Sequence, residues 1–407
     1  MSRPVDGIHL SGVGSGVENN TGATAHVLFL IDQLCGRGGA ESALLNTVRW
    51  LPDRFRCTIF TYRLNRELPM VGEFPCTVKA LPLSRTYDWN AFRLGSQLAR
   101  FIKAESVDIV HTFFPSSDLW GGVVTKLSRR PILISSRRDM GILRKPQHRV
   151  AYRALQGMFD CVLANSEEVR KYSIEQDGLD PAVVKTIYNG LDTSKYPRRT
   201  SPQADRRTFR VEGASHVITS IGNLRAVKGF DAFIRVASIV CREFPQAKFV
   251  IAGAEDPAEP ALRSQLCELI SALGVVNNVK FLGPVSDIPA LLSVSSVFCL
   301  LSRSEGFSNA LIEAMACGIP CVATRVGGNP EAITDHDTGF VVESDDPPAA
   351  AGRILELLRD PVRATEMGKR GQDVAHSRFS SQTYIDKLVQ VYDELLSRRE
   401  QETENSQ

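Results

Sequence analysis

The 407-residue chain lacks the features that mark several classes of protein. No apolar run reaches the roughly 18 residues that a membrane-spanning helix needs, so we expect no such helix. Residues 1–25 have neither a basic start nor a long apolar core, which argues against a signal peptide and predicts a disordered leader. The formal net charge is only +2, so bulk charge does not suggest nucleic acid as a partner.

The sequence also lacks a disulfide framework, a CxxC pair and a GxxxxGK[ST] phosphate loop. Its nine cysteines are scattered, which is typical of reduced thiols in a cytoplasmic protein. Asp335 and Asp337 have the DxD spacing of some divalent metal sites, but they lie in the turn-like segment 334–340 before a strand. We interpret them as turn residues and expect no metal.

What the chain does have is a repeated alternation of short apolar, β-branched runs with longer amphipathic ones. This pattern is typical of parallel sheets covered by helices. The first half holds candidate strands at 26–31, 57–62, 108–113, 131–136 and 161–166. The second half holds candidate strands at 216–222, 248–253, 279–283, 297–302 and 320–325. The prediction is an α/β protein with two Rossmann-like domains.

The polar segment 195–213 has no apolar period and is the best candidate for a linker. We therefore expect an N-terminal domain over 26–200 and a C-terminal domain over 201–380, followed by a last helix within 381–400. Ligands of open parallel sheets bind outside the carboxyl ends of the strands. We expect the chemistry in a cleft where those ends of the two domains face each other.

The segment 302-SRSEGFSNALIEAMACG-318 combines a helix start with two carboxylates. Ser308 is a good N-cap, and the helix N-terminus behind it is a ready anion site. Glu305 lies in the turn, and Glu313 lies about one and a half turns into the helix with its side chain tilted back. Both could accept hydrogen bonds from sugar hydroxyls on either side of a diphosphate. The alternative is a helix-dipole partner at Glu305 and an idle surface residue at Glu313.

Two cations in the same domain favour the interpretation of this helix N-terminus as an anion site. Arg225 and Lys228 follow the strand at 216–222 and could neutralise a diphosphate leaving group without a metal. A solvated loop pair is the alternative.

Glycines at the start of the first domain permit a close approach of backbone to ligand. Gly36, Gly38 and Gly39 follow the first strand, but their spacing is not GxGxxG. The second strand ends in 60-FTYR-63, without the acidic residue that would bind a ribose. NAD is therefore not favoured.

The first domain also carries a basic strip, formed by 126–131, 137–149 and Arg153. It would suit an anionic acceptor or membrane headgroups, and an ordinary charged surface is an equally good interpretation. His111, at the end of the third strand, either lines the cleft or is structural.

These motifs resemble the retaining, nucleotide-sugar-dependent glycosyltransferases of family four. The resemblance spans about 26–395, and 305-EGFSNALIE-313 matches the E-x7-E signature of that family. The other matching segments are GGAE at 38–41, 108–115, 164–172, 187–192, 222–230 and 326–342. The resemblance implies a GT-B type fold with two facing Rossmann-like domains, whose C-terminal helix returns to the N-terminal domain.

The resemblance also implies roles for individual residues. Glu313 would bind the ribose, Glu305 the donor hexose, and Arg225 with Lys228 the diphosphate. The remaining donor-binding residues would be Gly38, Gly39, Gly306, Phe307, Ser308 and Asn309. Many members carry a histidine after the fourth strand, where this chain reads 134-ISSRRDMG-141. Arg137, Arg138 or Asp139 would take the place of that histidine, and Arg138 or Asp139 is expected on the acceptor side, with His111 as a further candidate.

The expected reaction moves a hexose-type sugar from a UDP- or GDP-linked donor to an acceptor hydroxyl with retention, without cofactor or metal. The acceptor would be a glycan, a lipid-linked molecule or a small molecule, in polysaccharide or lipid-linked glycan assembly. We expect a cytoplasmic protein with peripheral contact at the inner membrane leaflet. Two alternatives remain: an isomerase of the nucleotide sugar with the same architecture, and a non-catalytic binding module.

Overall fold

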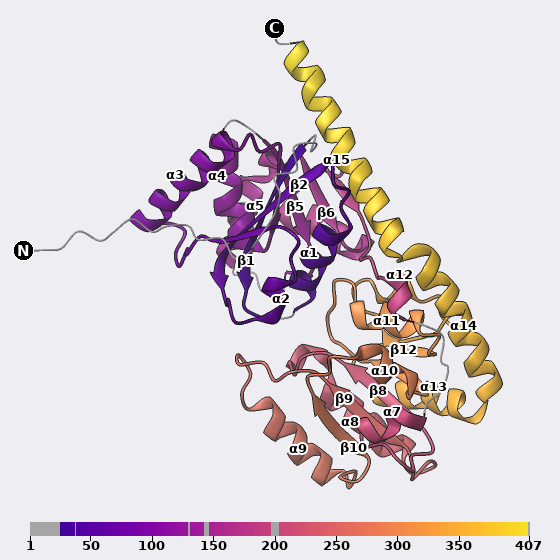
Figure 1. Ribbon diagram of the computed structural model, residues 1–407. Helices are drawn as coiled ribbons and strands as arrows, with labels where there is room; N and C mark the ends of the chain where they lie inside the picture. The colour runs from indigo at the N-terminus through magenta and orange to yellow at the C-terminus, as the bar shows by residue number, and fades with distance from the viewer. Residues whose placement is uncertain (1–24, 37, 129–130, 142–145, 197–202, 406–407) are drawn as a thin grey trace, which may run out of the picture. The chain divides into compact units, whose positions relative to one another are not determined.

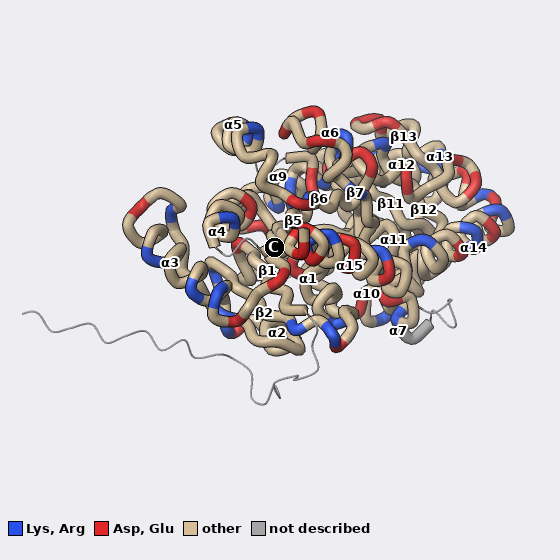
Figure 2. Tube along the Cα trace, turned by 90° about the horizontal axis from the view of Figure 1, so that it is seen from above, with Lys and Arg blue, Asp and Glu red and all other residues tan. Residues whose placement is uncertain are grey.

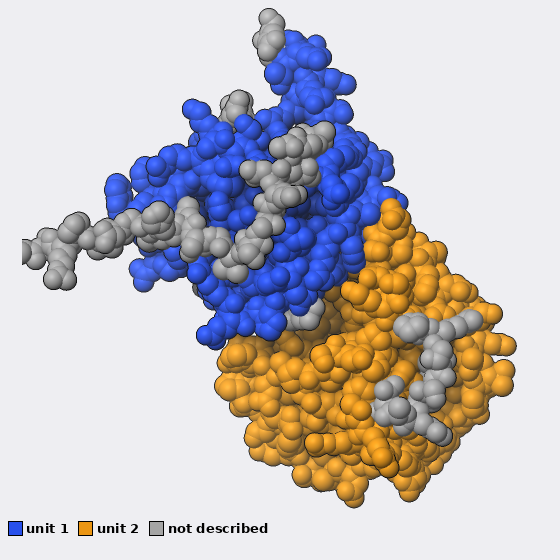
Figure 3. All heavy atoms as spheres, viewed as in Figure 1, with its two compact units in different colours: residues 1–165, 169–187, 384–407 blue, residues 166–168, 188–383 orange. Residues whose placement is uncertain are grey.

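The computed structural model describes residues 25–405, apart from 37, 129–130, 142–145 and 197–202. Its contacts divide the chain into two compact units (Figure 3). Unit 1 comprises the residues up to Asn165, Val169–Ile187 and the chain from Tyr384 onward, and unit 2 comprises Ser166–Glu168 and Tyr188–Thr383. The expected leader lies almost entirely outside the described residues, and so does the expected boundary near residue 200.

Unit 1 is built on a seven-stranded parallel sheet of order β3-β2-β1-β4-β5-β6-β7 (Figure 1). The strands are β1 (Ala25–Leu34), β2 (Phe55–Leu64), β3 (Thr77–Ala80), β4 (Ile109–Phe113), β5 (Ile132–Arg137), β6 (Cys161–Ala164) and β7 (Val184–Thr186). The core of β1, Val27 to Ile31, is wholly buried because helices cover both faces of the sheet. This explains why the strand reads as a continuous apolar run.

The helices of unit 1 follow the strands in the order expected for a parallel sheet. They are α1 (Gly39–Trp50), α2 (Pro69–Gly72), α3 (Trp89–Ala104), α4 (Gly122–Leu127), α5 (Pro146–Ala154) and α6 (Glu167–Asp177). Two short helical turns, η1 (Ser117–Gly121) and η2 (Gln156–Met158), complete the connections. The first turn of α6, up to Glu168, is grouped with unit 2.

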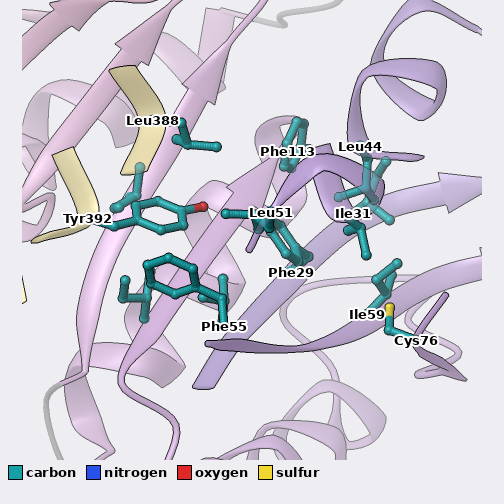
Figure 4. Close-up of a cluster of buried hydrophobic side chains, with 14 of the residues drawn as sticks. Phe29, Ile31, Leu44, Leu51, Phe55, Ile59, Cys76, Phe113, Leu388 and Tyr392 are labelled. Carbon is teal, nitrogen blue, oxygen red and sulfur yellow. The ribbon is translucent and has the colours of Figure 1, made fainter. Parts of the chain in front are cut away.

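The last helix, α15 (Ser381–Glu404), packs into the core of unit 1 along most of its length. Its buried residues recur at the spacing of one helix face: Ile385, Leu388, Val391, Tyr392 and Leu395. Figure 4 shows Tyr392 beside Phe55, and the two rings lie 5.6 Å apart in an edge-to-face arrangement. The expected return of the C-terminal helix to the N-terminal domain is confirmed.

Unit 2 is built on a six-stranded parallel sheet of order β10-β9-β8-β11-β12-β13. The strands are β8 (Val217–Ile221), β9 (Lys248–Ala252), β10 (Val279–Gly283), β11 (Val297–Leu300), β12 (Cys321–Thr324) and β13 (Phe340–Val342). The α-helices are α7 (Gln203–Thr208), α8 (Phe230–Val240), α9 (Leu262–Ala272), α10 (Ile288–Ser293), α11 (Asn309–Ala316), α12 (Asn329–Ala332), α13 (Pro347–Arg359) and α14 (Pro361–Arg378). Short turns η3 (Thr193–Lys195) and η4 (Ala226–Lys228) lie in its loops.

The two Rossmann-like sheets predicted from the sequence are confirmed. Sequence reasoning missed β3 and β7, which are only three or four residues long and lie at sheet edges, and β13 is the strand expected after the turn at 334–340. In each sheet the strand order reverses beside the first strand, between β1 and β4 in unit 1 and between β8 and β11 in unit 2. Ligands of such sheets bind outside the strand ends at these switch points, which directs attention to the loops there.

Candidate active site

A helix N-terminus at the switch point of unit 2 forms the centre of the candidate donor site. The chain leaves β11, turns at Glu305 and Gly306, and enters α11 at Asn309. The predicted N-cap, Ser308, accepts a hydrogen bond from the Leu311 N–H at 3.3 Å. The N–H groups and the positive dipole end of this helix are suited to an anion.

Three residues without an assigned role hold that turn in place. The Asn189 amide donates to the Phe307 carbonyl at 3.2 Å and to Asn309 Oδ1 at 2.6 Å. The Gly328 N–H donates to the Gly306 carbonyl at 2.8 Å. A Cβ at Gly327 would lie 1.9 Å from the Glu305 carbonyl oxygen, so this position requires glycine. The segments that contain these residues, 187–192 and 326–342, were part of the family resemblance in the sequence but received no function there.

The Phe307 side chain anchors the turn from the inside. Its ring is buried and packs 5.1 Å from the ring of Tyr188 and 5.1 Å from that of Phe379. The ring is therefore occupied by the core of unit 2, and the backbone is the part of Phe307 that can serve a ligand.

The structure brings two of the expected catalytic residues into direct contact. Lys228 Nζ donates to Glu305 Oε1 at 2.8 Å, and the Ser302 hydroxyl donates to the same oxygen at 2.7 Å. The side chain of Glu305 is only 10% exposed. A nearly buried carboxylate needs such partners, and Lys228 and Ser302 supply them.

Arg225 lies beside an acidic loop that sequence reasoning did not single out. Its Nε is 3.3 Å from Asp256 Oδ2 and 4.0 Å from Glu259 Oε1. Glu259 Oε2 also accepts the Ala226 N–H at 2.7 Å, which fixes the start of η4. The loop after β9 thus sets the direction of the guanidinium at the carboxyl edge of the sheet.

Glu313 lies on α11 among buried apolar residues. Burial raises the pKa of Glu313 to about 7, and a hydrogen bond with the Tyr196 hydroxyl partly opposes that rise. Burial, and next the Glu313 charge, raise the pKa of Tyr196 in turn. A carboxylate in this setting is stable only where hydroxyl groups satisfy it, which is how a ribose diol would act.

The glycines expected to contact donor phosphates lie in unit 1 at the start of α1. A Cβ at Gly38 would lie 2.4 Å from Glu41 Oε2, whereas a Cβ at Gly39 would meet nothing within 4 Å. Glu41 is buried, and burial raises the pKa of its carboxyl group. A side chain at Gly38 would therefore displace the Glu41 carboxylate, and the contact of both glycines with a donor stays a prediction.

A pocket opens at the switch point of unit 1, where the loops after β4 and β5 meet α1, η1 and α5. It is lined by Ala40, Phe113, Phe114, Pro115, Asp118, Ser136, Arg137, Arg138, Asp139 and Tyr152. Arg138 and Asp139, the two residues expected on the acceptor side, both belong to it. Burial lowers the pKa of Arg138, and Asp139 Oδ1 accepts the Gly141 N–H at 2.5 Å.

A buried ion pair that sequence reasoning missed forms one wall of this pocket. Arg137 Nη1 lies 2.6 Å from Asp118 Oδ2, and the two side chains are 2% and 1% exposed. Asp118 also accepts hydroxyl hydrogen bonds from Thr112, Ser135 and Tyr152 at 2.5, 2.7 and 2.7 Å. With four donors this carboxylate is fully satisfied, so we assign Asp118 to the architecture of the pocket.

His111 is buried below the same edge of the sheet. Its Nδ1 is 2.7 Å from the Tyr392 hydroxyl and its Nε2 is 2.8 Å from Ser136 Oγ. Burial, assisted by the nearby charge of Arg138, lowers the pKa of His111 to about 3. Because the ring is neutral and both nitrogens have partners, the contacts favour the structural interpretation over the acceptor-side one.

The remaining charged motifs have local partners. The Asp335 carboxylate accepts the Val341 N–H at 2.9 Å, which is the turn role predicted for it. In the basic strip, residues 129–130 and 142–145 lie outside the described residues. Of the others, Lys126 pairs with Asp160 at 2.6 Å and Arg153 donates to the Gln176 carbonyl at 3.0 Å.

Across the residues that the structure describes, no three His, Cys, Asp or Glu side chains come close enough to hold a metal ion. Within the same residues, no helix is both long and apolar enough to cross a membrane.

Two family models match the chain, one in each half. "Glycosyltransferase Family 4" matches residues 37–195, and "Glycosyl transferases group 1" matches residues 203–374. The chain is 26% identical to N-acetyl-alpha-D-glucosaminyl L-malate synthase of Bacillus anthracis, over 82% of this chain and 87% of that protein. It is 29% identical to a GDP-mannose-dependent phosphatidylinositol monomannoside mannosyltransferase of Mycolicibacterium smegmatis, over 69% and 74%.

The fold is shared with solved structures as well. The crystal structure of Anabaena Alr3699/HepE in complex with UDP-glucose superposes with a TM-score of 0.78 at 24% identity, covering 91% of this chain and 99% of that one. This likeness establishes the GT-B fold. With a family model matched in each half of the chain and the E-x7-E segment placed on α11, the chain belongs to the group 1, family four glycosyltransferases, retaining enzymes that transfer sugars from nucleotide sugars.

Proposed function

We propose that this enzyme transfers a hexose-type sugar from a UDP- or GDP-linked donor to an acceptor hydroxyl, in polysaccharide or lipid-linked glycan assembly. The proposed binding of a nucleotide-sugar donor rests on one observation, the contact of Lys228 with Glu305 beside the N-terminus of α11. A cation, a carboxylate and a helix dipole thereby share one strand edge. These are the groups that a sugar linked to a diphosphate requires.

The charges of unit 2 suggest how the donor is held and activated. Lys228, Arg225 and the α11 N-terminus stabilise the negative charge that develops on the departing diphosphate. Glu305 accepts hydrogen bonds from the hexose hydroxyls, and Glu313 accepts them from the ribose. Lys228 is then shared between Glu305 and a phosphate oxygen.

The pocket of unit 1 is our candidate for the acceptor site. Arg138 and Asp139 line it at the switch point, where a ligand of this sheet is expected. The relatives are named for L-malate and for phosphatidylinositol monomannoside, so both small and lipid-linked acceptors stay in the proposal. We also propose a cytoplasmic enzyme that meets its lipid-linked acceptor at the inner face of the membrane.

The two donor types in the proposal, UDP-linked and GDP-linked, come from the same comparisons. One relative is named for GDP-mannose, and the HepE complex holds UDP-glucose. A thermal-shift panel of uridine, guanosine and adenosine diphosphate sugars tests the proposal, because a ligand that binds only the folded state raises Tm. We expect stabilisation by a uridine or guanosine donor and none in Glu313→Ala. Absence of stabilisation by every donor would contradict it.

Product analysis separates transfer from its alternatives. Incubated alone, the donor of a transferase gives at most slow release of nucleoside diphosphate, whereas an isomerase forms a new nucleotide sugar. Donor binding without turnover across a wide acceptor panel would identify a non-catalytic binding module.

A further inference from the structure

Three aromatic side chains are exposed at the N-terminal end of α3, two on the helix and one just before its N-cap. Tyr87, Trp89 and Phe92 are 84%, 79% and 65% exposed, and the rings of Trp89 and Phe92 stack at 5.4 Å. The other two tryptophans of the chain, Trp50 and Trp120, are partly buried. Aromatic residues gathered on a surface in this way point to a partner that covers them.

Basic residues continue the same face along the helix. Arg93, Arg100 and Lys103 are exposed and follow Trp89 at steps of four, seven and three residues, which places all four on one side of α3. Figure 2 draws Lys and Arg positions in blue, some of them along α3. The helix has 16 residues and is therefore about 24 Å long, so the stripe runs for that length.

The acidic residues next to this stripe have other partners. Asp88 accepts the Ala91 N–H at 2.7 Å as the N-cap of α3, and Glu105 pairs with Arg56 at 3.0 Å. Among the described residues, Arg93, Arg100 and Lys103 form no ion pair with a carboxylate of the chain. The face therefore presents donors and positive charge beside apolar rings.

We propose that this face of α3 docks onto the surface of an anionic lipid bilayer. Tryptophan and tyrosine rings are suited to the headgroup level, where one side is apolar and the other hydrated. Arg93, Arg100 and Lys103 then contact the lipid phosphates. The inference uses neither the donor nor the acceptor site and holds whichever sugar is transferred.

Two other occupants fit this face less well. Three rings bury at most about 750 Å², below the roughly 800 Å² per partner of a stable dimer interface. A glycan that stacks on Trp89 would also need acceptors for its hydroxyls, and the two neighbouring carboxylates are already engaged. Phosphate headgroups need only donors and positive charge, which this face supplies.

Co-sedimentation of the full-length protein with vesicles tests the proposal. We expect binding to phosphatidylcholine vesicles that contain phosphatidylglycerol, little binding to phosphatidylcholine alone, and weakening with salt. Trp89→Ser with Phe92→Ser removes the rings and should abolish binding. Arg93→Gln, Arg100→Gln and Lys103→Gln together should weaken it by about fivefold per charge.

Matched substitutions in unit 2 serve as controls. Val276→Ser with Val362→Ser removes apolar side chains that are 61% and 70% exposed. Arg235→Gln, Arg242→Gln and Lys369→Gln remove three exposed charges. Both control sets should sediment like the wild type, and all variants should keep its Tm.

Tryptophan fluorescence gives an independent readout. Vesicles should shift the emission of the wild type to the blue and leave Trp89→Phe unshifted, because Trp50 and Trp120 are partly buried and Trp120 packs against the buried side of α3 at Gly95. The proposal is overturned if the wild type does not bind anionic vesicles, or if both α3 variants bind them as strongly as the wild type. Two results would assign the face to another occupant. A change in gel-filtration elution volume on substituting the rings, without vesicles, would indicate a second copy of the chain. Loss of binding to a soluble glycan on the same substitutions would indicate a glycan.

Discussion

Removing the charge of Lys228 tests the donor mechanism most directly. Lys228→Ala deletes the cation that lies 2.8 Å from Glu305 at the edge where we propose that the diphosphate departs. Loss of one preorganised group that stabilises developing negative charge costs about 10²–10³ in kcat. We therefore expect the release of nucleoside diphosphate from the donor to slow by that factor, with a smaller loss of donor affinity.

The same substitution disturbs stability, and the structure indicates by how much. Glu305 is 10% exposed and keeps the Ser302 hydroxyl at 2.7 Å, so it is not left without a partner. Removing one hydrogen-bond partner of a buried acceptor lowers the free energy of unfolding by about 1–3 kcal/mol. In a domain of this size each kcal/mol corresponds to about 2–4 °C in Tm.

A double variant separates the two effects. Lys228→Ala with Glu305→Gln also removes the charge that Lys228 no longer balances, so Tm should recover while the rate stays low. Lys248→Ala is the matched control, because Lys248 begins β9 at the opposite edge of the same sheet and bonds the Asn277 carbonyl. The assay is donor turnover without acceptor, at saturating donor. Wild-type turnover in Lys228→Ala would refute the assigned role.

Further outcomes follow from the other contacts of unit 2. Because the pKa of Glu313 is about 7, donor affinity measured by calorimetry should rise as pH increases through 7, and Glu313→Gln should remove that dependence. The same raised pKa lies above the ordinary value of 4.5, so the folded state retains a proton that the unfolded state loses. This carboxyl group therefore lowers Tm as pH rises from about 4.5 to about 7, an effect that Glu313→Gln should also abolish. Asn189→Ala should raise KM for the donor with little change in kcat, since it loosens the turn around Phe307, and an unchanged KM would contradict that role. Gly327→Ala should abolish donor stabilisation in a thermal-shift assay, because its Cβ displaces the Glu305 carbonyl, and a wild-type shift would count against it.

The sequence predicted those parts of the structure that depend on residues close together in the chain. The strands alternate with helices at a period that a short window reveals, and the Ser308 cap depends on the next three residues. Lys228 and Glu305 are 77 positions apart, yet both follow strands, so parallel-sheet geometry was enough to predict a common edge.

The contacts that the sequence did not predict depend on loop paths. Asp118 sits in the helical turn η1, and its link to Arg137 exists only because β4 and β5 are adjacent in the sheet. Tyr196 reaches Glu313 from a loop with no periodic signal. His111 read equally well as a ligand or a core residue until its two partners were known.

The charges of the candidate donor site share one property that bears on how a ligand enters. Lys228 is paired with Glu305, Arg225 lies between Asp256 and Glu259, and Glu313 bonds Tyr196. A diphosphate bound as we propose would replace existing partners rather than meet bare charge, and its net gain would be the difference between two sets of contacts. Such an exchange keeps the free domain from accumulating costly buried charge. It also limits the affinity for the nucleoside diphosphate product, which must leave before the next turnover.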